Sequence, residues 1–467
     1  MNDYISMPAI YKRTGVRRFD GNPFIEALPS MEKTKDSILD RLINYPDPPT
    51  KADRRKSEMV RLAEAGVVSS IVYPFAEYKR AGTNLTINLR EPYVARNPIT
   101  IEDKQRRAAI ALQESQGVPF PSNWNSSAKG QSLLGISGSG KTTFAESFAL
   151  PYLVVIEHTE YNGIPLKCRQ IPWVTLRVPH DATLKSLCLQ FFERIDSILG
   201  NTNYLREARG ARSVSQMVML MAKVATAVSL GVIFVDEVQN LRSARGTQAE
   251  VMLNLFSEII EKAGVSLVIA GTPAVEDVID KNVRNLRKLN SGGESRFSLM
   301  KLGDPEFDAF CDKYWEYQYV GKPRRLTPEI RKAWHRSGAG NPAFTAMAFM
   351  LAQRTEIGGR EQIDEVSFER VSKKDMAILE PAISALRSGK SARLREFDDL
   401  LFKEGCRSLL DMIGWTVPSK PKDGIGDEFD DLPEEKHAAE PRKKKLRRGL
   451  AKAMAPVDLP TENPLIM

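Results

Sequence analysis

The sequence predicts an α/β protein with a three-layer core, in which helices cover both faces of a parallel sheet, followed by a helical lid. Three observations support this fold class. Apolar, strand-like runs alternate with helical patterns from about residue 131 to residue 304. A glycine-rich loop at residues 135–142 stands between the first of these runs and a helical pattern. After Pro305 the strand signal ends, whereas helical periodicity continues.

Length and composition favour a soluble protein of several structural units. The chain has 467 residues, of which 42% are hydrophobic and 27% charged, and its formal net charge is +8. Mild basicity is compatible with nucleic-acid binding, but many proteins that never contact nucleic acid share it. The four cysteines are far apart and there are only four histidines, which argues against a zinc site. The sequence shows no bilayer-length apolar run and no signal peptide, so we expect a cytoplasmic protein without a membrane partner.

Four regions follow one another along the chain. They are a proline-rich, charged extension (1–100), the α/β core (101–304), the helical lid (305–413) and a charged tail (414–467). The tail joins an acidic stretch to the basic block RKKKLRR, and such charge blocks are usually solvated and disordered.

Local patterns predict the elements within these regions. In the extension, helices are expected at 31–45 and 57–66, and short strand-like runs at 67–75 and 83–90. A helix is expected at 101–116. In the core, the expected strands are 131–136, two extended runs at 153–161 and 167–178 that form a hairpin around Asn162-Gly163, 231–237, 265–272 and a strand at Arg296. Helical periodicity marks 183–199, 213–230 and 249–264 in the core, and 307–320, 327–338, 341–356, 364–375 and 381–389 in the lid.

The loop GISGSGKT fits the pattern G-x-x-x-x-G-K-[ST] at every position and has the strand before it and helix after it that the motif requires. Its backbone N–H groups and the following helix start can hold phosphates. Lys141 can reach the β- and γ-phosphates, and Thr142 can hold Mg²⁺. The sequence therefore predicts ATP and Mg²⁺ as cofactors, bound by Gly135, Ser137, Gly138, Ser139, Gly140, Lys141, Thr142 and Thr143.

Polar residues follow two further strands. Asp236 ends the run GVIFVDE and is placed to hold Mg²⁺, while Glu237 would orient the attacking water. Thr272 ends the next strand and either senses the γ-phosphate or caps a helix. Arg296 either stabilises charge on the nucleotide of a neighbouring subunit or forms a salt bridge at a strand edge. Lys141, Glu237, Thr272 and Arg296 are thus the predicted catalytic residues of an ATPase.

These motifs, in this order, resemble those of AAA+ ATPases. Finer matches are RRFDGNPFIEALP (17–29), YVARNP (93–98), DATLKSLCLQFFERID (181–196) and FVDEVQNLRSAR (234–245), and together they resemble the TnsC/TniB family of DNA-transposition regulators. The resemblance covers about residues 12–400. It departs from the AAA+ pattern in the lid, where no arginine follows the glycines of Gly338-Ala339-Gly340-Asn341-Pro342 and Arg336 precedes them.

The resemblance implies a bacterial ATPase that oligomerises on duplex DNA, as a ring or filament of six or seven subunits per turn. It implies that the extension docks a target-selecting protein and that the oligomer recruits transposase subunits, with the tail as a candidate contact on its charge alone. It places sequence-independent DNA contacts at His180, Thr183 and Lys185. A second candidate DNA surface is Arg206, Arg209 and Arg212, which are equally compatible with a solvated helix face.

Two other functions remain open at this stage. A helicase loader or replication initiator would share the AAA+ core, although it has no evident need for segments 17–29 and 93–98. A DNA-binding platform that binds ATP with little turnover is the other possibility, and the intact Glu237 argues against it.

Overall fold

A parallel sheet of five strands forms the centre of the fold. The strands lie in the order β5-β6-β7-β2-β8, and all neighbours pair in parallel. They are β2 (Gly130–Gly135), β5 (Trp173–Arg177), β6 (Val232–Asp236), β7 (Ser266–Gly271) and β8 (Glu294–Phe297). The three inner strands are buried along their whole length, as their uninterrupted apolar sequences predict. The predicted α/β fold is confirmed.

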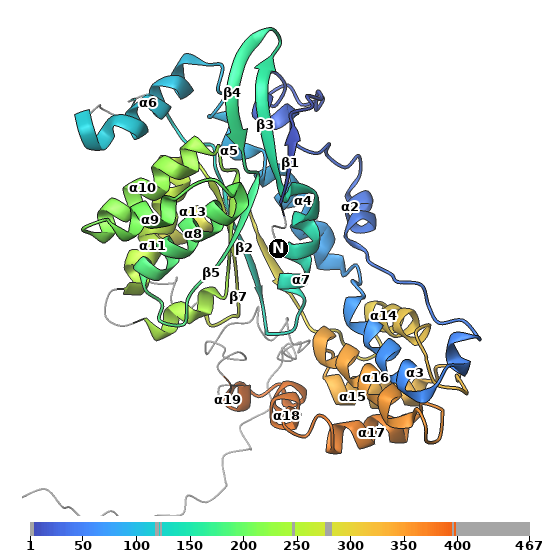
Figure 1. Ribbon diagram of the computed structural model, residues 1–467. Helices are drawn as coiled ribbons and strands as arrows, with labels where there is room; N and C mark the ends of the chain where they lie inside the picture. The colour runs from blue at the N-terminus through green and yellow to red at the C-terminus, as the bar shows by residue number, and fades with distance from the viewer. Residues whose placement is uncertain are drawn as a thin grey trace, which may run out of the picture. The chain divides into compact units, whose positions relative to one another are not determined.

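Helices cover both faces of this sheet and give the core its three layers (Figure 1). On β6, Ile233 and Val235 face one helical layer and Val232 and Phe234 face the other, because successive side chains of a strand point to opposite faces. The first layer is α8 (Leu184–Leu199), α9 (Tyr204–Arg209), α10 (Val214–Ala227), α11 (Gln248–Glu258) with a π-helical turn (Ile259–Ala263), and α13 (Val283–Leu289). The second contains α4 (Ala76–Asn88), α7 (Lys141–Ala149) and the turn η3 (Leu150–Tyr152).

A smaller sheet has the strand order β1-β3-β4. Strands β3 (Val154–Tyr161) and β4 (Ile164–Gln170) form the predicted hairpin, and β1 (Ile5–Pro8) pairs in parallel with β3. The extended run expected at 167–178 is not one strand, because it is divided between β4 and β5 of the main sheet. Asn162 and Gly163 both have positive φ, which suits the tight turn of a hairpin.

The lid is helical, as the sequence predicts. Its helices are α14 (Pro305–Trp315), α15 (Pro328–Gly338), α16 (Pro342–Glu356), α17 (Glu365–Lys373), α18 (Glu380–Ser388) and the short α19 (Ser391–Leu394). Trp334 is fully buried at the lid's centre and stacks on Phe349 and Phe368 at ring distances of 4.9 and 5.4 Å.

The N-terminal extension packs against both the core and the lid. Leu42 and Leu85 lie in the apolar cluster beneath the sheet, whereas Val68 and Ile71 lie in the cluster of the lid. Its elements are α1 (Pro23–Glu26), α2 (Lys35–Leu42), η1 (Asp53–Arg55), α3 (Glu58–Glu64), η2 (Ala65–Ser70), α4 and α5 (Glu91–Val94), and α6 (Ile101–Gln116) follows.

Two strand predictions in the extension were wrong. Residues 83–90 belong mainly to α4, whose buried residues Tyr78, Ala81 and Leu85 recur at helical spacing. Residues 67–75 contain the 3₁₀ turn η2 and a single bridge between Val72 and Asn44. The threonines and β-branched residues favoured strands locally, but packing on the sheet and the lid decided the conformation.

The two segments 17–29 and 93–98 bind each other. The side chain of Asn22 donates to Tyr93 O at 2.5 Å, and that of Asn97 donates to Gly21 O at 3.0 Å. The guanidinium of Arg18 also pairs with Glu91, two residues before the second segment. Several residues that make these segments distinctive in sequence therefore serve contacts within the protein itself.

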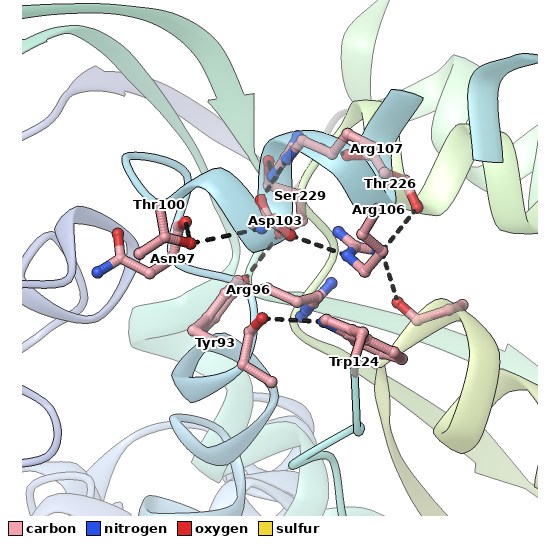
Figure 2. A network of polar contacts seen from close by, with 12 residues as sticks. Tyr93, Arg96, Asn97, Thr100, Asp103, Arg106, Arg107, Trp124, Thr226 and Ser229 are labelled. Atoms are coloured by element: carbon pink, nitrogen blue, oxygen red, sulfur yellow. Dashed lines mark hydrogen bonds and ion pairs between the residues drawn. The ribbon is translucent and has the colours of Figure 1, made fainter. Parts of the chain in front are cut away.

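A buried charge network fixes α6 to the core (Figure 2). Asp103 accepts hydrogen bonds from Arg106 Nε at 2.8 Å and Arg107 Nε at 2.6 Å, and Arg107 continues to Thr226 O at 3.1 Å. Arg96 donates to Leu230 O at 2.8 Å. Burial by itself would raise the pKa of the Asp103 carboxyl, but the two guanidinium groups outweigh it and lower that pKa.

The structure, a computed structural model, describes residues 4–116, 121, 124–244, 248–275, 283–394 and 397. Within this part of the chain, no helix combines the length and the apolar character needed to cross a membrane. The charged tail, with its acidic stretch and its basic block, lies outside the described residues.

We expect Asp103→Asn to lower the free energy of unfolding by about 3 kcal/mol, because it leaves buried guanidinium groups uncompensated. Glu102→Gln, on the exposed side of the same helix, is the matched control and should change little. Since the Asp103 pKa is lowered in the folded state, its contribution is present at neutral pH and is lost as the pH falls below the usual carboxyl range. Chemical unfolding of both variants at pH 7 and at about pH 2 measures this, and equal stabilities at pH 7 would contradict it.

Candidate nucleotide site

The glycine-rich loop turns tightly between β2 and α7. Gly138 and Gly140 have φ of 79° and 94°, a backbone region that residues with a Cβ rarely adopt. A Cβ on Gly140 would lie 2.6 Å from the Tyr78 hydroxyl, and one on Gly138 would lie 2.6 Å from Asn341 Oδ1. Only glycine therefore suits either position, and the N-terminus of α7 adds its positive end to the loop.

The residues that would hold ATP and Mg²⁺ lie together here. Lys141 Nζ donates to the carbonyls of Gly135 and Ile136, at 2.6 and 3.0 Å, so its charge is held inside the loop. Thr142 Oγ1 donates to Asp236 Oδ2 at 3.0 Å, which joins a hydroxyl and a carboxylate of the kind that Mg²⁺ prefers. Among the described residues, the buried Ser139 Oγ has no hydrogen-bond partner. This donor set fits a nucleotide with its metal ion.

Glu237 follows Asp236 at the end of β6 and has the left-handed φ of 58°. Its Oε2 accepts a hydrogen bond from Gln239 Nε2 at 2.5 Å, and Gln239 Oε1 accepts one from Thr272 N at 3.2 Å. The Thr272 hydroxyl is buried and, within the described part of the chain, makes no hydrogen bond, so no capping role is seen for it. Gln239 thus joins Glu237, which follows β6, to Thr272, which follows β7.

A cavity of about 440 Å³ contains these groups. Its polar lining comes from the loop, the acidic pair and Thr272. Its aromatic and apolar lining comes from Tyr73, Phe75, Tyr78, Phe310, Tyr314 and Met347. The volume lies within the range of small-molecule sites, and the combination of charged and aromatic groups suits phosphates and a base.

The lid reaches the glycine-rich loop through the cap of α16. Asn341 Oδ1 accepts from the N–H groups of Ala343 and Phe344, and its Nδ2 donates to Ser137 O at 2.8 Å. Ala343 N donates to Gly138 O at 3.2 Å. Because a trans peptide directs C=O and the next N–H to opposite sides, these two bonds fix the direction of the N–H groups that follow Ser137 and Gly138.

Among the described residues, the lid places no arginine at its contact with the glycine-rich loop. Arg336 is exposed, and no arginine is among the described residues that line the cavity. The lid contacts the loop through the uncharged residues Asn341 and Ala343.

Arg296 lies on the edge strand β8 and forms an ion pair with Glu294 of the same strand. The backbone of Glu294 also accepts a hydrogen bond from Arg80 Nη2 at 2.9 Å. The salt bridge that the sequence left as one alternative is therefore present, and a role toward a neighbouring subunit stays a prediction.

The candidate DNA residues form two separate sets. His180 and Lys185 are exposed near the N-terminus of α8, which Thr183 caps by accepting from Ser186 N. The second set is exposed on or after α9, which begins beyond the other end of α8; it comprises Arg206, Arg209 and Arg212.

The backbone segment that carries His180 is hydrogen-bonded to the turn η4 (Val238–Ser243), which follows Glu237. Asn240 Nδ2 donates to Val178 O at 2.9 Å, and Ser243 Oγ donates to His180 O at 3.2 Å. The segment that carries His180 is thus attached to the same turn as the acidic pair.

Several residues of the site were missed in the sequence. Gln239 has no motif of its own, and only its position two residues after Glu237 could have drawn attention to it. Tyr73, Phe75 and Tyr78 lie more than 50 residues before the glycine-rich loop and reach the cavity through the packing of the extension.

Comparisons with known proteins bear on this domain. Residues 126–279 match the family described as AAA domain, and no curated protein sequence matches the chain. Solved structures that resemble it include the Orc1 protein of Aeropyrum pernix in complex with DNA, at 15% identity and a TM-score of 0.38, covering 66% of this chain and 72% of that one. A Walker-type ATPase of Pyrococcus abyssi matches at 14% identity and a TM-score of 0.38, covering 69% of this chain and 86% of that one. Cdc6p of Pyrobaculum aerophilum matches at 14% identity and a TM-score of 0.35, covering 68% of this chain and 83% of that one. With the parallel sheet and its glycine-rich loop, the family match assigns the core an AAA+ P-loop fold.

We expect Asn341→Ser to weaken nucleotide binding about fivefold, since serine still caps α16 but cannot reach Ser137 O. One hydrogen bond is worth about 1 kcal/mol, which corresponds to this factor. Thr327→Asn, which exchanges one capping residue for another on α15, is the control. Calorimetric titration with ATP measures both, and wild-type affinity in the Asn341 variant would show that the lid contact does not shape the loop.

Proposed function

We propose that this chain is an AAA+ ATPase that regulates DNA transposition by assembling on duplex DNA in an ATP-dependent way. The observation that carries the ATPase part is the meeting of Lys141, the Thr142–Asp236 pair and Glu237 in one cavity at the carboxyl edge of the sheet. Ligands of open α/β sheets bind at this edge. The aromatic residues that line the cavity suit an adenine base.

The chemistry of the site follows from its charges. Thr142 and Asp236 would hold Mg²⁺, which when bound supplies positive charge to the phosphate oxygens. Lys141 would exchange its two carbonyl partners for phosphate oxygens. Glu237 would accept a hydrogen bond from the attacking water and orient it, while the glycine-rich loop holds the phosphates through backbone N–H groups.

The role in transposition rests on the resemblance of segments 17–29 and 93–98 to the TnsC/TniB family. These segments contact each other, so they form one unit of the extension. Most of their apolar residues are buried, and a target-selecting protein would have to contact exposed residues nearby, such as Lys12, Arg13, Arg17 and Arg18. We propose the tail as the transposase contact.

Oligomerisation would explain the use of ATP. In the proposed ring or filament, of six or seven subunits per turn, Arg296 would approach the nucleotide of the adjacent subunit, which links assembly to ATP. The exposed residues His180 and Lys185, with the half-buried Thr183 between them, would contact the phosphate backbone without reading sequence. Arg206, Arg209 and Arg212 are the second candidate surface.

We expect Lys141→Ala to abolish ATP-dependent assembly on DNA, because it removes the charge that holds the phosphates. Fluorescence anisotropy on random-sequence duplex DNA, with ATP, a non-hydrolysable analogue, ADP or no nucleotide, measures this. The wild type should bind cooperatively only with ATP or the analogue. Equal binding in all four conditions, or none, would favour a helicase loader or initiator, and retained ATP-dependent assembly in the variant would contradict the nucleotide switch.

We expect Lys185→Ala to weaken DNA binding similarly for all DNA sequences. The slope of the logarithm of the binding constant against the logarithm of the salt concentration should become shallower by about one, the value for one lost phosphate contact. Lys167→Ala, an exposed lysine on β4, is the matched control. Binding of several unrelated duplexes at three salt concentrations measures the slope. A loss that depends on the DNA sequence would be inconsistent with a backbone contact.

A further inference from the structure

Gln239 connects two strand ends of the nucleotide site. Its side-chain amide donates to Glu237 Oε2 at 2.5 Å and accepts from Thr272 N at 3.2 Å. The partners define which way the amide is turned, since the opposite orientation would set its oxygen against the carboxylate and its NH₂ group against an N–H. One residue thus joins the end of β6 to the end of β7.

The backbone at Glu237 and at Gly271 accommodates the Gln239 side chain. The left-handed φ of 58° at Glu237 turns the chain sharply after β6, and Gln239 lies in the turn η4 that follows. On β7, a Cβ at Gly271 would lie 3.1 Å from Gln239 Oε1 and 2.4 Å from Val275 Cγ2. A glycine at position 271 therefore leaves room for the amide.

We infer that Gln239 is a positioning residue for ATP hydrolysis, which orients the Glu237 carboxylate toward the attacking water. The inference rests on the proposed function, in which Glu237 acts on that water. A glutamate side chain loses about 1–2 kcal/mol of conformational entropy when it is held in one orientation. Gln239 holds it before the nucleotide arrives, and by binding Oε2 it directs Oε1 to the water.

A neutral amide suits this role better than a charged partner. A lysine or arginine at position 239 would neutralise the carboxylate and reduce its ability to accept a proton from water, whereas an amide orients it and leaves its charge in place. The link to Thr272 N holds the amide itself, so Glu237 is oriented relative to the strand end that carries the buried Thr272 hydroxyl.

The test compares wild type, Gln239→Leu, Glu237→Gln and the double variant in steady-state ATP hydrolysis. Leucine fills similar space and makes no hydrogen bond. We expect Gln239→Leu to lower kcat about 10- to 100-fold, the scale of one hydrogen bond to a charged group, with KM changed less than about twofold. In the Glu237→Gln background the same change should have no further effect, because Gln239 acts through the carboxylate.

A second readout needs no nucleotide. For this readout Glu237→Ala replaces Glu237→Gln, because glutamine would keep an oxygen that accepts from the Gln239 amide. If the two side chains interact in the free protein, the loss of Tm in the double variant is smaller than the sum of the two single losses. An unchanged kcat in Gln239→Leu, or additive losses of kcat and Tm, would overturn the inference while leaving the ATPase intact. Wild-type hydrolysis no faster than that of Glu237→Gln would overturn the proposed catalytic role of Glu237 and the inference with it.

Discussion

The nucleotide site depends on the alignment of three neighbouring parallel strands. β2, β7 and β6 lie side by side and end at one edge of the sheet, and each carries a different part of the chemistry. β2 leads into the phosphate loop, β6 ends at Asp236 with Glu237 next, and Thr272 follows the end of β7. Hydrogen bonding between the strands places Lys141, Asp236 and Thr272 near one another, although Lys141 and Thr272 are 131 positions apart in sequence.

The glycine-rich loop is also contacted by both the extension and the lid. Tyr78 of the extension donates to Gly140 O at 2.9 Å, while Asn341 of the lid donates to Ser137 O. Burial raises the pKa of Tyr78, so the phenol stays protonated and remains a donor. Extension, core and lid therefore all contribute to the conformation of a loop whose own sequence is mostly glycine and serine.

The extension combines two physical roles. Its apolar residues join the clusters of the sheet and of the lid, and its charged residues pair across long distances in sequence. Arg61, for example, makes a double hydrogen bond to Glu361, whose pKa is lowered to about 2 mainly by this contact. The lid is thus tied to the core by contacts of the extension as well as by the chain that follows β8.

Much of the fold and the polar half of the site could be predicted from residues close together in sequence. Uninterrupted apolar strands, helical periodicity and the motif GISGSGKT depend on local patterns, which is why β2, β6, β7 and the lid helices were identified. The aromatic half of the cavity, the Asn341 contact and the Gln239 bridge join residues from distant segments that have no pattern of their own. Residues 83–90 show the same limit, because their β-branched composition favoured a strand until packing against the sheet made them a helix.

By itself, the sequence determined which chemical groups the protein carries and on which elements they lie, because strand and helix periodicity and loop glycines act over a few residues. The tertiary structure alone decided which of those groups meet. Arg296 pairs with Glu294, the segment that carries His180 is bonded to the turn after Glu237, and the cap of α16 touches the phosphate loop. The reason is physical: such contacts depend on how layers pack around a common core, and packing is a property of the whole chain.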